Sequence, residues 1–100
     1  MNISFEAKVA LVTGAGAGMG LATARAFAAA GAAVALADVH EDAARSAAEQ
    51  LNAAGHQAIG IRCNVAVEAE VAAMIQQTVA AFGRLDAAYN NASRGHRGVS

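Results

Sequence analysis

Short apolar runs alternate along the chain with longer alanine-rich stretches. Each run is bounded by turn residues and is too short for a helix, which predicts a buried strand. The predicted strands cover residues 8–13, 32–38, 58–65 and 85–92, and Gly60 weakens the third. The stretches between them, residues 18–30, 41–55 and 68–82, have helical propensity or periodicity and close at a glycine. This alternation, with short connections, predicts an α/β protein with parallel strands and right-handed crossovers.

The second and third predicted helices each carry an apolar face, which we expect to lie in the core. On the second helix the face consists of Ala44, Ala47, Ala48 and Leu51. On the third it is a stripe formed by Val71, Met74, Ile75, Val79 and Phe82.

Composition narrows the class of protein. The chain has 100 residues and is 56% hydrophobic, which predicts one small domain with a buried core. Its net charge of -1 supplies no basic field, so nucleic acid is not expected as a partner. Charged residues interrupt the apolar runs, and the N-terminus lacks the features of a signal peptide. We therefore expect no membrane segment and a cytoplasmic protein.

The cysteine and histidine residues give no sign of a metal site. A single cysteine, Cys63, excludes an intrachain disulfide. His40, His56 and His96 do not share ligand spacing with Cys63 or with one another. We expect solvated loop histidines and a buried structural thiol.

The stretch "TGAGAGMG", residues 13–20, lies between the first predicted strand and its helix. Such a turn presents unpaired N–H groups and the positive end of the helix dipole, and glycines let a diphosphate approach the backbone. A P-loop is excluded because Leu21 follows Gly20, and the G-x-G-x-x-G pattern fails by one position. The pattern that fits is Thr-Gly-x-x-x-Gly-x-Gly, with Thr13, Gly14, Gly18 and Gly20. The alternative is that these glycines only make a tight turn.

Asp38 ends the second predicted strand, close to the spacing expected for a carboxylate that accepts the adenosine ribose hydroxyls. A carboxylate there repels a 2′-phosphate, and neither Val39, His40 nor the glycine loop offers a basic side chain to hold one. The predicted cofactor is therefore NAD rather than NADP. The alternative is that Asp38 caps the following helix.

The glycine loop, the acidic end of the second strand, "CNV" (63–65) and "GRLDAAYNNA" (83–92) together resemble the short-chain dehydrogenase/reductase family over residues 6–92. The resemblance implies a Rossmann-like, doubly wound parallel sheet, here partial, with strand order 3-2-1-4. It also implies a hydride transfer between NAD and a small-molecule alcohol or carbonyl substrate.

The resemblance also implies roles for single residues in the cofactor site. Thr13 belongs to this site as the first residue of the Thr-Gly-x-x-x-Gly-x-Gly pattern. Gly14, Gly18 and Gly20 are implied to bind the cofactor diphosphate, and Met19 to lie along the nicotinamide half. Asn64 and Val65 are implied to border the adenine, and Asn90 and Ala92 to line the cleft after the fourth strand. Asn64 stands where the family often has Asp, and its amide oxygen accepts hydrogen bonds more weakly.

The family's catalytic Tyr-x-x-x-Lys pair is absent from these 100 residues. The single tyrosine, Tyr89, is followed four positions later by Ser93, and the single lysine is Lys8. We therefore expect residues 1–92 to be a cofactor-binding half-domain and residues 93–100 to be a divergent tail of a truncated or frame-shifted chain. The alternatives are a nucleotide-binding module without catalysis and a structural or interaction fragment.

The expected strand order has a further consequence, because it leaves the fourth strand as an apolar open edge. Such an edge favours pairing with a second chain, or leaves the domain only marginally stable. We therefore expect a homo-oligomer.

Overall fold

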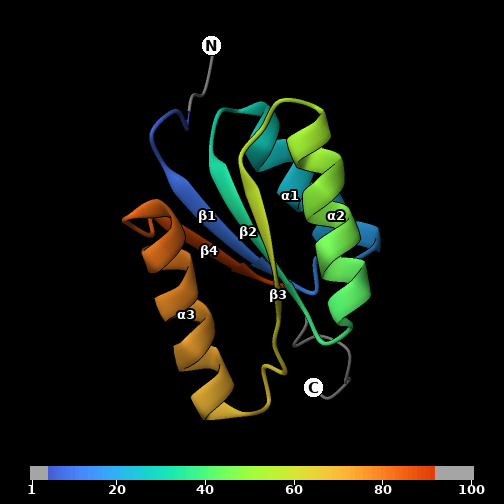
Figure 1. The fold of residues 1–100 in the computed structure, drawn as a ribbon, viewed down its shortest axis with the longest axis vertical. Coiled ribbons are helices and arrows are strands. Elements are labelled where there is room, and N and C mark those ends of the chain that lie inside the picture. The colour runs from blue at the N-terminus through green and yellow to red at the C-terminus, as the bar shows by residue number, and fades with distance from the viewer. Residues whose placement is uncertain (1–4, 92–100) are drawn as a thin grey trace.

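The computed structural model describes residues 5–91, which form one parallel sheet with helices on both faces (Figure 1). The elements in chain order are β1 (Val9–Thr13), α1 (Gly18–Ala29), β2 (Ala33–Asp38), α2 (Glu41–Ala53), β3 (Ala58–Arg62), α3 (Glu68–Phe82) and β4 (Ala87–Asn90). The strands are parallel and lie in the order β3-β2-β1-β4, which confirms the predicted topology. Among residues 5–91 no helix has both the length and the apolar character that crossing a membrane requires.

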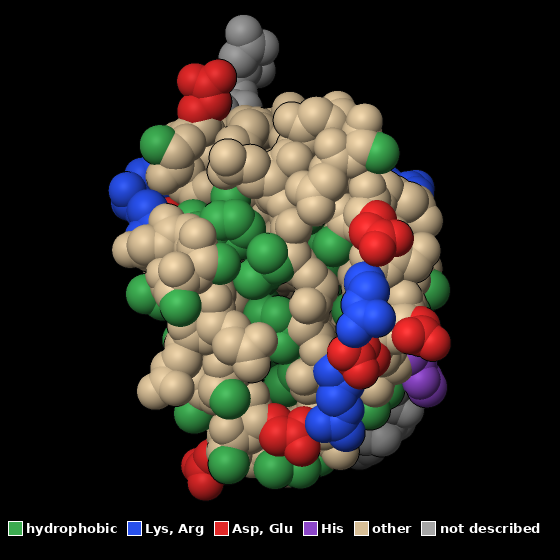
Figure 2. Space-filling model, viewed as in Figure 1, with side chains coloured by type: hydrophobic (Ala, Val, Ile, Leu, Met, Phe, Trp, Pro, Cys, Tyr) green, Lys and Arg blue, Asp and Glu red, His purple; other side chains and the backbone are tan. Residues whose placement is uncertain are grey.

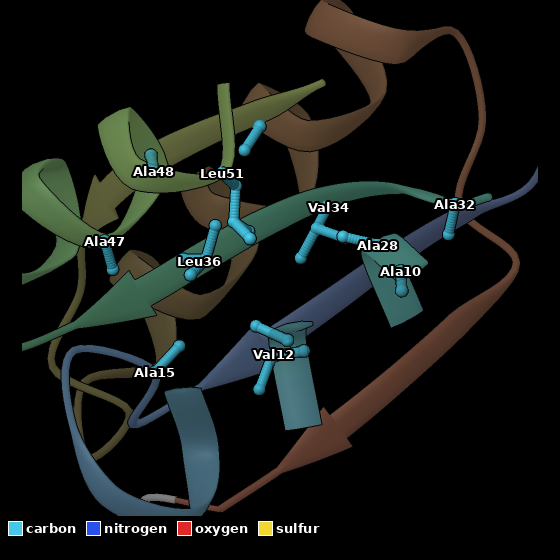
Figure 3. Close-up of a cluster of buried hydrophobic side chains, with 12 residues drawn as sticks. Ala10, Val12, Ala15, Ala28, Ala32, Val34, Leu36, Ala47, Ala48 and Leu51 are labelled. Atoms are coloured by element: carbon cyan, nitrogen blue, oxygen red, sulfur yellow. The ribbon is translucent and has the colours of Figure 1, made fainter. Parts of the chain in front are cut away.

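The helices α1 and α2 cover one face of the sheet and α3 lies on the other (Figure 1). On the first face Val12, Val34 and Leu36 point toward alanines of the two helices (Figure 3). The predicted apolar face of α2 is confirmed, because all four of its residues are buried. Alanine has no side chain beyond Cβ, so both helices can approach the sheet closely while filling the space between.

The predicted core stripe of α3 is only partly correct. Met74 is buried, but Ile75 and Val79 are 41% and 40% exposed. The helix instead turns Thr78 toward the sheet, and that side chain is fully buried. Its hydroxyl donates to the Met74 carbonyl oxygen at 2.9 Å, which satisfies the polar group inside the helix. The periodic pattern identified an apolar side of the helix, but the side that faces the sheet is centred on Met74 and Thr78 rather than on Ile75 and Val79.

Gly60 lies where the backbone of α2 passes close to β3. A Cβ atom at this position would lie 2.6 Å from the carbonyl oxygen of Ala44 and 2.9 Å from the Cα of Arg45. The backbone of α2 therefore crosses β3 at a distance that only glycine permits.

The edge strand β4 is fastened to β1 at its beginning by Asp86. The backbone N–H of Asp86 donates to the Val9 carbonyl at 2.9 Å, and the Val9 N–H donates to Asp86 Oδ2 at 2.8 Å. Arg84 donates to both carboxylate oxygens of Asp86. The Arg84 hydrogen bonds and the Val9 N–H hold the pKa of the Asp86 carboxyl below its ordinary value of 3.8.

This lowered pKa predicts an acid-dependent loss of stability. In the unfolded chain Asp86 regains its ordinary pKa, so its stabilising contribution is complete above that value and disappears as the pH falls through the lower folded pKa. We expect Asp86→Asn to reduce the free energy of unfolding at neutral pH, and the difference from the wild type to shrink below about pH 4. Urea unfolding of both proteins from neutral pH to below about pH 4 measures this difference in the free energy of unfolding. A difference that does not change with pH would contradict the prediction.

Candidate functional site

The carboxyl ends of the four strands lie at one end of the sheet, where the loops that follow them meet (Figure 1). In register, Thr13 lies beside Ala37 and Asn90, and Asp38 lies beside Arg62. In an open parallel sheet this is the end at which ligands bind, on either side of the point where the strand order reverses. Here that point lies between β1 and β4.

The glycine loop leads directly from β1 into α1. Gly14 and Gly18 have φ angles of 63° and 60°, which side chains other than glycine rarely adopt. Ala17 is the N-cap of α1 and no side chain caps the helix, whose first turn also lacks acidic residues. The first N–H groups and the positive end of the helix dipole are therefore available to an anion.

Gly20 has a different role from the other two glycines, because it is buried inside the first turn of α1. A Cβ atom here would overlap the carbonyl oxygen of Gly14. The third glycine of the pattern therefore lets α1 pack against the start of its own loop. This contact fixes the direction in which the N-terminal N–H groups point.

Asp38 is joined to the glycine loop by a hydrogen bond. Its Oδ2 accepts the N–H of Gly16 at 2.9 Å, and its Oδ1 accepts the N–H of His40 at 2.9 Å. His40, and not Asp38, is the N-cap of α2, and no side chain caps this helix. The alternative role of Asp38 as the cap of α2 is therefore wrong, and the carboxylate belongs to the loop cluster.

Gly16 is a residue that the sequence reasoning missed, because the pattern treats its position as variable. A Cβ atom there would lie 2.9 Å from Asp38 Oδ2 and 2.6 Å from the Cβ of Ala43. The only available signal was the excess of glycine in residues 13–20 over what the pattern requires.

A recess of about 370 Å³ opens beside Asp38. It is lined by Gly14, Asp38, Val39, His40, Cys63, Asn64 and Val65. The sequence assigned four of these residues to a cofactor site, and the structure brings those four together. Burial raises the pKa of the Cys63 thiol, the nearby Glu70 carboxylate raises it further, and Arg62 opposes both, so the thiol stays protonated at neutral pH.

Asn64 begins the turn from β3 to α3, and its side chain stabilises that turn. Its Oδ1 accepts the Ala66 N–H at 2.9 Å, and its backbone carbonyl accepts the Val67 N–H at 3.0 Å. An amide oxygen has two lone pairs, so Oδ1 can accept one more hydrogen bond.

Thr13 connects the ends of β1 and β4. Its hydroxyl donates to Asn90 Oδ1 at 2.6 Å and accepts the Asn91 N–H at 3.0 Å. The two hydrogen bonds of Thr13 hold Asn90 next to the glycine loop.

Two other residues predicted for the cofactor site are Met19 and Ala92. Met19, in the first turn of α1, is 70% exposed, and Ala92 lies outside the described residues.

A second, apolar recess of about 350 Å³ lies between α3 and the β1–β4 side of the sheet. The lining of this recess includes Leu11, Met74, Ile75 and Tyr89, with Thr13 and Asn90 where it approaches the carboxyl end of the strands. Hydrophobic side chains also gather in the hollow between α3 and β3 (Figure 2). Within residues 5–91 no group of three or more His, Cys, Asp or Glu residues could hold a metal ion. His96 lies outside that range.

The sheet order, the glycine loop and the acidic end of β2 define a Rossmann-like α/β domain. The family model described as short chain dehydrogenase matches residues 8–100, and the chain belongs to this family.

Similar proteins include the 2,5-dichloro-2,5-cyclohexadiene-1,4-diol dehydrogenase of Sphingobium indicum. It is 42% identical over 86 residues, which are 86% of this chain and 33% of that protein. The 7alpha-hydroxysteroid dehydrogenase of Escherichia coli is 37% identical over 94 residues, which are 94% of this chain and 37% of that protein. The chain thus spans about a third of the length of these curated relatives.

Solved structures agree with the same family. The 7 alpha-hydroxysteroid dehydrogenase complexed with NADH and 7-oxo glycochenodeoxycholic acid superposes with a TM-score of 0.84 and 36% identity. The match covers 87% of this chain and 34% of that one.

The contact between Gly20 and Gly14 leads to a prediction about stability. We expect Gly20→Ala to lower the free energy of unfolding by about 1–3 kcal/mol, because the added methyl group displaces α1 from the loop. Met19→Ala, in the same turn and exposed, is the control and leaves stability nearly unchanged. Urea unfolding of both variants measures the difference. If Gly20→Ala were as stable as the wild type, the prediction would be wrong and the loop could relax around the methyl group.

Proposed function

We propose that residues 1–92 are the cofactor-binding part of an NAD-dependent short-chain dehydrogenase that transfers a hydride between NAD and a small-molecule alcohol or carbonyl substrate. The observation that carries the proposal is the Asp38 carboxylate held against the glycine loop by the Gly16 N–H. This carboxylate would accept a ribose hydroxyl beside a helix N-terminus that can receive a diphosphate, which supports the proposal. The NADH bound to the 7 alpha-hydroxysteroid dehydrogenase supports a nicotinamide dinucleotide as the cofactor.

The residues present fit the diphosphate and the adenosine ribose of such a cofactor. The diphosphate would lie on the first turn of α1, where Gly14 and Gly18 would allow its approach and Gly20 lets α1 pack against the loop. Each Asp38 oxygen accepts one N–H and retains a lone pair for a ribose hydroxyl.

The position proposed for the diphosphate and the ribose also suggests which residues would border the adenine and the nicotinamide. The adenine would occupy the recess bordered by Asn64 and Val65. Met19, Asn90 and Ala92 are proposed for the nicotinamide side, with Thr13 orienting Asn90.

The recess favours NAD over NADP. Its lining contains the Asp38 carboxylate and no lysine or arginine, so a 2′-phosphate would meet a negative charge without a basic partner. Both relatives named above are dehydrogenases of alcohols by their names, which supports an alcohol or carbonyl as the substrate.

The cofactor would accept the hydride from an alcohol or supply it to a carbonyl, and the described residues would bind and orient the cofactor. Proton transfer would need the family's Tyr-x-x-x-Lys pair, which the 100 residues do not contain. Residues 93–100, proposed as a divergent tail, lie outside the described residues. A cytoplasmic location stays a prediction from the sequence.

Calorimetric titration with NAD and NADP tests the cofactor assignment. We expect NAD to bind at least tenfold more tightly, and Asp38→Asn to weaken NAD binding about 10-fold to 100-fold, because hydrogen bonds to a charged acceptor are lost. The same variant should reduce the preference over NADP. Asp42→Asn, in the exposed first turn of α2, is the control and should bind both cofactors like the wild type. Equal affinity of the wild type for NAD and NADP would contradict the proposed role of Asp38.

We further propose that two copies of the chain associate through β4 and the adjoining face of α3. In the described sheet β4 has a neighbour only on its β1 side, and Tyr89, Ile75 and Val79 are each about two-fifths exposed. An open strand edge next to exposed apolar side chains favours pairing with a second sheet.

Sedimentation velocity over a range of concentrations measures this association. We expect a concentration-dependent dimer that Val79→Lys shifts toward the monomer, because the interface would then bury a charge. Gln76→Lys, also exposed on α3, is the control for the added charge. A wild type that remains monomeric at every concentration would refute the association.

A further inference from the structure

Glu70, in the first turn of α3, holds the backbone of the preceding turn. Its Oε1 accepts the N–H of Asn64 at 2.8 Å and also accepts Arg62 Nη1 at 2.8 Å. A single carboxylate oxygen therefore joins the end of β3, the turn and α3. These hydrogen bonds keep the pKa of the Glu70 carboxyl below its ordinary value, with the Asn64 N–H as the main cause.

The segment that Glu70 holds is one wall of the recess beside Asp38. Cys63, Asn64 and Val65 line that recess. The other side of the same segment is attached to β2, because the Cys63 N–H donates to the Asp38 carbonyl at 3.0 Å. The wall is thus fixed to the acidic end of β2 by Cys63 and to α3 by Glu70.

The ion pair between Arg62 and Glu70 does not explain the arrangement by itself. The two side chains are 47% and 34% exposed, and ion pairs at that exposure contribute little to stability. The hydrogen bond to a backbone N–H differs, since it sets the position of the chain where the recess begins. Glu70 is absent from the lining itself and acts through the residues that form it.

We propose that Glu70 is a positioning residue for the adenine end of the cofactor site, because its carboxylate holds the backbone of Asn64, which with Val65 lines the recess beside Asp38. The inference rests on the proposed dinucleotide site and adds to it a residue that contacts no part of the cofactor.

Two ligands separate this role from a general effect on folding. NADH carries the adenosine group, whereas reduced nicotinamide mononucleotide lacks it and does not reach the recess. We expect Glu70→Ala to weaken NADH binding about tenfold, the effect of losing one charge-assisted hydrogen bond, and to leave binding of the mononucleotide unchanged. Fluorescence titration of the reduced nicotinamide measures both affinities in the purified protein.

Two further variants complete the test. Glu70→Gln keeps an oxygen that can accept the Asn64 N–H, so we expect it to restore most of the NADH affinity. Glu68→Ala, two positions earlier in the same helical turn and exposed, should bind both ligands like the wild type.

Amide hydrogen exchange supplies a readout that needs no ligand. We expect the Asn64 N–H to lose protection in Glu70→Ala and to keep it in Glu68→Ala. If wild-type protein binds NADH and Glu70→Ala binds it equally well, the positioning role is wrong while the proposed function stands. Equal losses for NADH and the mononucleotide would reduce Glu70 to a structural residue. If the wild type binds no NADH, the proposed function fails and the positioning role fails with it, whatever the Asn64 exchange shows.

Discussion

The close contact between the first turn of α1 and the carbonyl oxygen of Gly14 determines much of the site. Gly20 permits this contact because it has no Cβ atom. With α1 seated there, its uncapped N-terminus faces the end of the sheet, and the Gly16 N–H comes within hydrogen-bonding distance of Asp38. The arrangement of the loop, the helix dipole and the carboxylate thus depends on this contact, together with the positive φ angles of Gly14 and Gly18 and the close approach at Gly16.

The remaining positions of the site are fixed by polar side chains that join neighbouring strands and turns. Thr13 fixes Asn90 at the end of β4, and Glu70 fixes Asn64 at the end of β3. Such hydrogen bonds contribute modestly to stability, but they are directional. They therefore set the geometry of a site whose core is built mainly from small, non-directional alanine contacts.

The sequence predicted the strands and the buried face of α2, because each depends on local periodicity and on turn residues. The strand order was implied by the resemblance to the short-chain dehydrogenase/reductase family, and the structure has the same order. It misjudged Ile75 and Val79, since periodicity identifies an apolar side of a helix but not how far the sheet extends beneath it. Gly16 and Glu70 could not be found in this way. The role of Gly16 depends on Asp38, which is 22 positions away in the sequence. The role of Glu70 depends on the backbone N–H of Asn64, and a pattern of residue types contains no information about a backbone contact.

The two hydrogen bonds of Asp38 also bear on how a nucleotide would be recognised. Its carboxylate is already held in one rotamer by two backbone N–H groups before any ligand arrives. A side chain that is ordered in advance loses little conformational entropy on binding. The negative charge that would distinguish one dinucleotide from the other is therefore in place at first encounter, so discrimination by this residue requires no rearrangement of the protein.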